Sequence, residues 1–139
     1  MTHKITTTWK GGMLFDSDNP SAHHVLMDTD VEGQTRQGLS PKAMMLSSLA
    51  GCSGLDVVSI LEKMKVEVDD FKMEVEGELT EEHPKYYKTV WVTYHFSGTD
   101  LNEERINRAV QLSVEKYCGV MEMFRQFADI KIDIKFHSK

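Results

Sequence analysis

Hydrophobic residues recur at two different spacings along this chain, and the change of spacing divides it into elements. β-Branched or alternating apolar stretches, separated by turn residues, predict three short strands at residues 5–9, 13–15 and 25–27. Ser40 and Pro41 then resemble a helix start, with serine as N-cap and proline at the first helical position. Apolar residues recur at helical spacing from there to about Met64. We therefore predict three strands followed by one long helix.

The second half of the chain predicts two strands, two helical pieces and a final strand. Apolar residues alternate with charged ones at 71–79 and 130–136 and recur at every second position of 90–96 within 87–97, which indicates strands with one buried face. Asp100 and Glu103 resemble a capping box that opens a helix. The inward stripe of that helix is expected to be Ile106, Ala109, Val110, Ser113, Val114 and Tyr117. Cys118-Gly119 should interrupt it, and residues 120–127 should form a second helical piece.

The resulting order is βββ-α-ββ-α-(α)-β, without internal repeats. Strands that do not alternate regularly with helices favour an α+β fold over a doubly wound parallel sheet. At 139 residues the chain has the length of one domain, so we expect a single domain over residues 1–139.

The middle of the long helix, Ser47–Gly54, consists largely of small residues. One interpretation is close packing, where another helix or strand approaches the backbone. The other is that small neighbours leave the thiol of Cys52 accessible to a substrate. The sequence leaves both interpretations open.

Composition narrows the classes of partner. The chain is 40% hydrophobic and 27% charged with a net charge of −6, which argues against nucleic acid or an anionic membrane as a main partner. We find no apolar run of about 18 residues and no secretory signal, so we expect no membrane span and a cytoplasmic location. The cysteines should then begin as thiols. Nine methionines suit irregular cores, subunit interfaces and pockets for apolar ligands.

The two cysteines, Cys52 and Cys118, lie 66 positions apart and form neither a zinc knuckle nor a Cys-x-x-Cys redox pair. Taken alone, a cysteine in a helix is more often a small buried hydrophobic residue than a reactive group. His23 and His24 are adjacent and should point to opposite sides of a strand, and the other four histidines are scattered. We therefore expect no metal and no cofactor, since no glycine-rich phosphate loop occurs either.

The residues around the cysteines carry a family resemblance. Residues 38–52 resemble the central-helix motif of the OsmC/Ohr superfamily, in which a proline-led helix of apolar and small residues reaches Ala-Gly-Cys. Residues 54–61, 82–85 and 115–120 are similar to a less-characterised branch of OsmC-like proteins. The similar segments occur in the expected order and cover essentially the whole chain.

The resemblance implies an OsmC-like fold in an intertwined homodimer, with the long helix at its centre and the thiols at the subunit interface. It also implies that Cys52 attacks the O–O bond of a hydroperoxide and becomes a sulfenic acid. Cys118 would then form an intrachain disulfide, which an external dithiol reduces. Apolar, methionine-rich surroundings would favour organic peroxides over hydrogen peroxide.

The sequence departs from the peroxidase branch at the residues that activate the thiol. That branch has an arginine after the first glycine turn and a glutamate ten residues before the cysteine, and here these positions hold Met13 and Lys42. On a straight helix Lys42 lies about 15 Å from Cys52. It could act only on the cysteine of a partner subunit, or it could be a solvated lysine of the first turn.

Other side chains could take part in activation. Arg36 lies in the loop before the long helix, and Lys10 and Arg125 are further possible cations. Asp56 follows Cys52 by one helical turn, where a carboxylate would oppose ionisation of the thiol or accept a hydrogen bond from a neighbouring helix end.

Three functional hypotheses follow. The first is a thiol-dependent hydroperoxide reductase that uses Cys52 and Cys118. The second is a non-peroxidatic OsmC-like protein that binds a small apolar ligand at the dimer interface or senses oxidants. The third is an assembly module. Two cysteines in their family positions favour the first.

Overall fold

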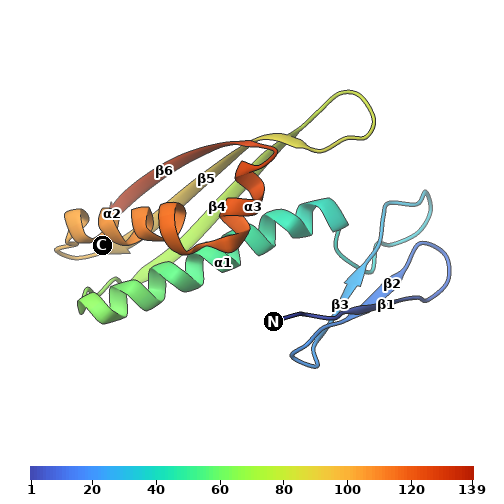
Figure 1. The fold of residues 1–139 in the computed structure, drawn as a ribbon, viewed down its shortest axis with the longest axis horizontal. Helices are drawn as coiled ribbons and strands as arrows, with labels where there is room; N and C mark the ends of the chain where they lie inside the picture. The colour runs from blue at the N-terminus through green and yellow to red at the C-terminus, as the bar shows by residue number, and fades with distance from the viewer. The chain divides into compact units, whose positions relative to one another are not determined.

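The structure, a computed structural model, describes all 139 residues and divides them into two units, residues 1–45 and 46–139. The expectation of a single domain over residues 1–139 stays a prediction. The first unit is an antiparallel sheet with the strand order β1-β2-β3 (Figure 1). Its strands are β1 (Thr6–Trp9), β2 (Phe15–Asp18) and β3 (His24–Met27).

The second unit combines a three-stranded sheet with helices. Its elements are α1 (Pro41–Met64, whose first residues belong to the first unit), β4 (Asp70–Leu79), β5 (Tyr87–Gly98), α2 (Glu103–Leu112), a π-helical turn η1 (Ser113–Tyr117), α3 (Gly119–Arg125) and β6 (Asp129–Ser138). The strand order is β4-β5-β6, with β4 antiparallel and β6 parallel to β5. The parallel pairing is possible because α2, η1 and α3 carry the chain back along the sheet before β6 begins.

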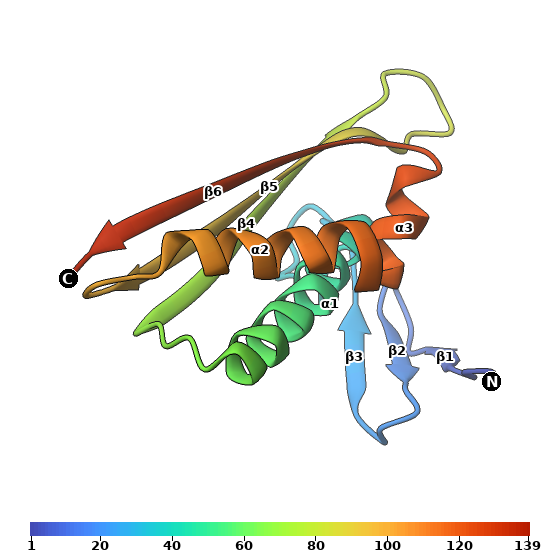
Figure 2. The same ribbon diagram turned by 60° about the vertical axis from the view of Figure 1, so that its left-hand side comes forward.

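The core lies between this sheet and the helices α1 and α2, which lie on the same face of it (Figure 2). The side chains of β5 that point to this face are fully buried: Val90, Val92, Tyr94 and Phe96. Helix α1 contributes a buried stripe at every fourth position, Leu49, Ser53, Val57 and Leu61. Three of those four are aliphatic, so the serine at the fully buried position 53 stands out.

The predicted α+β class and order of elements are confirmed, and two local predictions are wrong. Asn102, not Asp100, caps α2: its side chain accepts the N–H of Arg105 at 3.2 Å, whereas Asp100 has a φ of 55° before the helix. Tyr117 does not join the inward stripe and is 53% exposed. The π-helical turn adds a residue to one turn, which rotates the following side chains away from the helical stripe.

Helix α1 also revises our expectation that no segment could span a membrane. By length and composition alone it is apolar enough to cross one, because Asp56 is the only charged residue between Lys42 and Glu62. A single helix of this kind is weak evidence, since core helices of soluble proteins pass the same test. In this structure the helix places a stripe of side chains in the core.

Candidate thiol site

Cys52 lies near the middle of α1, next to the fully buried Ser53. It is half-buried, and its side chain packs against the core. The two glycines that flank this region differ. A Cβ added at Gly51 would meet no atom within 4 Å, whereas at Gly54 it would contact Met73 Sδ at 3.4 Å, an ordinary packing distance. Close packing therefore explains a glycine at position 54 at most. The space beside Gly51 is open.

Cys118 lies at the junction between the π-helical turn and α3, where it is the N-cap residue. Its N–H donates to Ser113 O at 2.8 Å, which closes the π-helical turn. Its Sγ accepts the N–H of Met121 at 3.3 Å, so the sulfur takes the place of the usual capping oxygen. The residue is only 3% exposed. The backbone thus holds the Cys118 sulfur at the first turn of α3.

The fold brings these two cysteines together. Both are free thiols, and the Cys52 thiol lies close enough to Cys118 to raise the pKa of Cys118. Burial is the main cause that raises the pKa of Cys118 to about 11; the hydrogen bond from Met121 lowers that pKa, and the neighbouring Cys52 thiol and the negative charge of Asp56 add to the increase. Cys118 therefore keeps its proton at neutral pH.

A chain of buried hydroxyl groups lies beside the thiols. Ser53 Oγ is 2.6 Å from the hydroxyl of Tyr94 on β5 and 2.8 Å from Ser113 Oγ in the π-helical turn. Ser113 Oγ donates to Asp56 Oδ2 at 3.2 Å and is 3.3 Å from Ser53 O. Burial raises the pKa of Tyr94 to about 12, so its hydroxyl stays protonated.

Sequence reasoning missed three of these four residues. The sequence predicts Ser113 only as part of the packing stripe of its helix, and it indicates no role for Ser53 or Tyr94. The available signal was a serine at an inward position of an apolar helical stripe, because a buried hydroxyl requires a hydrogen-bond partner. Asp56 accepts its hydrogen bond from the hydroxyl of Ser113, at the C-terminal end of α2.

The expected cations occupy other surroundings. Arg36 pairs with Asp30 at 3.2 Å within the first unit, and Lys42 is exposed in the first turn of α1. Arg125 donates to Val114 O at 2.7 Å, which ties α3 to the π-helical turn. Met13, at the position of the family arginine, is 56% exposed. A role of any of these residues in activation stays a prediction.

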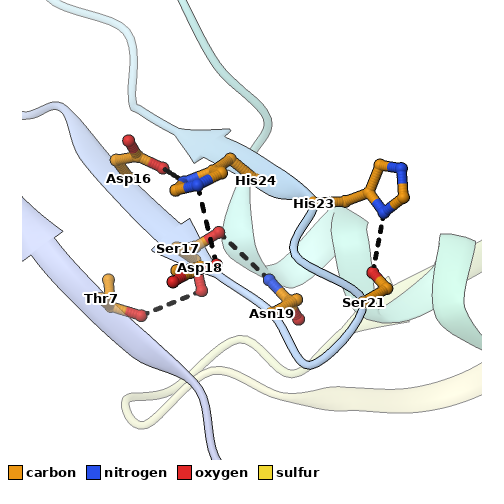
Figure 3. Close-up of polar contacts among 8 residues, drawn as sticks. All are labelled: Thr7, Asp16, Ser17, Asp18, Asn19, Ser21, His23 and His24. Atoms are coloured by element: carbon orange, nitrogen blue, oxygen red, sulfur yellow. Dashed lines mark hydrogen bonds and ion pairs between the residues drawn. The ribbon is translucent and has the colours of Figure 1, made fainter.

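The first unit holds a separate polar cluster on its sheet (Figure 3). His24 Nδ1 is 2.8 Å from Asp16 Oδ1, and His24 Nε2 is 3.6 Å from Asp18 Oδ1. The hydrogen bond and charge of Asp16 raise the pKa of His24 above its ordinary value. No group of three or more histidine, cysteine, aspartate or glutamate side chains in the structure is arranged to hold a metal ion. We therefore interpret the cluster as two surface ion pairs that link β2 and β3.

Comparisons with known proteins agree with this architecture. The sequence model described as "OsmC-like protein" matches residues 33–133. Protein YhfA of Escherichia coli K12 is 35% identical over 122 residues, which cover 88% of this chain and 89% of that protein. A hypothetical protein from Aquifex aeolicus VF5 has a similar structure, with a TM-score of 0.88, 29% identity, and coverage of 100% of this chain and 98% of the other.

A more distant structure shows the same fold. The organic hydroperoxide resistance protein OhrB of Bacillus subtilis superposes with a TM-score of 0.66 at 18% identity, over 96% of this chain and 98% of that one. At this identity the likeness establishes the fold alone.

Proposed function

This chain belongs to the OsmC-like protein family, and from that premise we propose that it reduces hydroperoxides with the thiols of Cys52 and Cys118. The observation that supports the proposal most directly is the proximity of two thiols that are 66 positions apart in the sequence. A pair of cysteines kept only as small core residues has no need to meet. The name of the Bacillus subtilis relative supports organic hydroperoxides as the substrate class.

The two thiols differ in a way that supports the proposed order of action. Cys52 is the more exposed and can meet a peroxide, whereas Cys118 is 3% exposed and holds its proton because its pKa is about 11. In the first step the Cys52 thiolate attacks the distal oxygen of ROOH, the O–O bond breaks, and the alkoxide takes a proton to leave as ROH. The products are the Cys52 sulfenic acid and an alcohol.

In the second step Cys118 attacks the sulfur of the Cys52 sulfenic acid. An S–S bond forms, and the departing hydroxide combines with the proton released from the Cys118 thiol to give water. An external dithiol then reduces the disulfide by thiol–disulfide exchange and is itself oxidised to a disulfide. Because Cys118 lies close to Cys52, this step competes well with further oxidation of the sulfenic acid.

The proposal extends to assembly and location. We propose a homodimer, because apolar side chains of α1 are uncovered in the single chain: Leu55 is 76% exposed, Val58 53% and Met45 45%. Exposed apolar side chains gathered on one element are typical of surfaces that a partner covers. We propose a cytoplasmic location, where dithiol reductants are available to renew the thiols.

One observation favours a second candidate function. Met13 and Lys42 stand where the peroxidase branch has its arginine and glutamate, so the usual means of activating the thiol is missing. The alternative is a non-peroxidatic protein that binds a small apolar ligand at the dimer interface or senses oxidants through its cysteines.

A direct test measures the consumption of cumene hydroperoxide with dithiothreitol or a dihydrolipoyl compound as reductant. The wild-type protein should turn over repeatedly, and Cys52→Ser should show only the background rate. The matched variant Cys118→Ser should still consume the first equivalent but accumulate over-oxidised Cys52, which mass spectrometry detects. If the wild type is no faster than Cys52→Ser, peroxide reduction is wrong. A thermal shift with fatty-acid-like ligands would then support the alternative.

A further inference from the structure

The hydroxyl chain beside the thiols joins three elements that are distant in the sequence. Tyr94 lies on the central strand β5, Ser53 and Asp56 on α1, and Ser113 at the start of the π-helical turn. Tyr94, Ser53 and Ser113 are fully buried, and consecutive oxygens are 2.6, 2.8 and 3.2 Å apart. Polar groups so deep in a core are costly unless each finds a partner.

The carboxylate of Asp56, at the end of the hydroxyl chain, fixes which oxygen donates and which accepts in each hydrogen bond. The Ser113 hydroxyl donates to the Asp56 carboxylate at 3.2 Å, with the backbone carbonyl of Ser53 as a second acceptor at 3.3 Å. A hydroxyl has one proton to donate, so Ser113 must accept at its contact with Ser53, and Ser53 must in turn accept from Tyr94. In this arrangement Tyr94, Ser53 and Ser113 each donate once, and the chain ends on a charged acceptor. Hydrogen bonds to charged groups are the stronger ones.

Both serines are coupled directly to the cysteines. Ser53 is the next residue after Cys52 on α1, so the position of one fixes that of the other within the helix. Ser113 O accepts the N–H of Cys118 at 2.8 Å across the π-helical turn. The Ser53–Ser113 contact therefore connects the backbone that carries one thiol to the backbone that carries the other.

We propose that Ser53 and Ser113, held by Tyr94 and Asp56, are positioning residues that set the separation of Cys52 and Cys118 and so favour their disulfide. The inference rests on the proposed role of the two cysteines as a redox pair. Placement matters here, because a disulfide requires its two Cα atoms within about 7 Å and correctly aimed Cβ atoms. Removing one hydroxyl from the hydroxyl chain loosens the link between α1 and the π-helical turn. The effective concentration of one thiol toward the other then falls.

The test measures the thiol–disulfide equilibrium of the purified protein in buffers of reduced and oxidised dithiothreitol. The S–S bond of oxidised dithiothreitol breaks as the Cys52–Cys118 bond forms, and the two thiol protons pass to reduced dithiothreitol. No peroxide takes part, so failure of the peroxidase proposal leaves this measurement interpretable. Trapping with an alkylating reagent followed by mass spectrometry gives the fraction of disulfide.

We expect Ser113→Ala to lower the equilibrium constant by up to about tenfold, the limit reached if the hydrogen bonds that it removes stabilise only the disulfide form. Tyr94→Phe keeps the ring in the core and breaks only the first link, so it should lower the constant by less, up to about threefold. The matched control is Ser17→Ala. This hydroxyl is also buried and hydrogen-bonded, to Thr7 at 3.1 Å, but it lies on the N-terminal sheet, and the variant should stay within about twofold of the wild type.

The equilibrium constant separates positioning from general stability. A substitution that destabilises the reduced and oxidised forms equally lowers the free energy of unfolding but leaves this constant unchanged. Unchanged constants in both Ser113→Ala and Tyr94→Phe, checked by circular dichroism to be folded, would overturn the proposal. So would higher constants in these variants, or a wild-type protein that forms no Cys52–Cys118 disulfide.

Discussion

Removal of the Tyr94 hydroxyl should change how the stability of this protein depends on pH. The side chain is fully buried, and burial raises its pKa from 10.0 to about 12. In Tyr94→Phe the ring still fills the core, but the hydrogen bond to Ser53 at 2.6 Å is lost. Near neutral pH we therefore expect the variant to be less stable by about 1 kcal/mol, the typical net contribution of one hydrogen bond.

Alkaline pH should reduce the difference in the free energy of unfolding between the wild type and Tyr94→Phe. Between pH 10 and 12 the folded wild type keeps a proton on Tyr94 that the unfolded chain releases, so its stability falls as pH rises through that window. By about pH 11 the unfolded tyrosine is mostly ionised and the folded one mostly protonated, which costs the wild type about 1 kcal/mol. Phenylalanine has no proton to lose. The two proteins should therefore be nearly equal in stability at about pH 11.

Urea unfolding followed by circular dichroism, from about pH 8 to about pH 11 and at one fixed protein concentration, measures this difference. Other titrating groups, Cys118 among them, act on both proteins and largely cancel in the comparison. A difference that stays constant or widens toward pH 11 would refute the reasoning, because Tyr94 would then titrate alike in the folded and unfolded states.

Two further predictions concern reactivity and packing. Iodoacetamide at neutral pH should modify Cys52 before Cys118, because Cys118 is buried and has a pKa of about 11. Peptide mass spectrometry measures the modification rate of each cysteine. Equal rates in the folded protein would contradict the structure. Gly77→Ala should destabilise the protein by about 1–3 kcal/mol in urea unfolding, because its Cβ would lie 2.5 Å from a ring carbon of Tyr87. An unchanged midpoint would show that this ring moves aside freely.

The sequence predicted those features of the fold that depend on neighbouring residues. Alternation identified the faces of β4, β5 and β6, and the serine–proline pair located the start of α1 correctly. These signals are local, since side-chain direction repeats every two residues in a strand and about every 3.6 in a helix. The motif around Cys52 likewise sufficed for the family.

Tertiary structure decided the features that depend on contacts between distant residues. No pattern of neighbouring residues indicates the parallel pairing of β5 and β6, the π-helical turn or the burial of Cys118. The hydroxyl chain joins residues 41 and 60 positions apart, so only the packing of α1 against β5 and η1 could show it. The sequence by itself determined that two cysteines are present in a family motif. The fold determined that they meet, because a contact across a core depends on how whole elements pack rather than on the residues beside each cysteine.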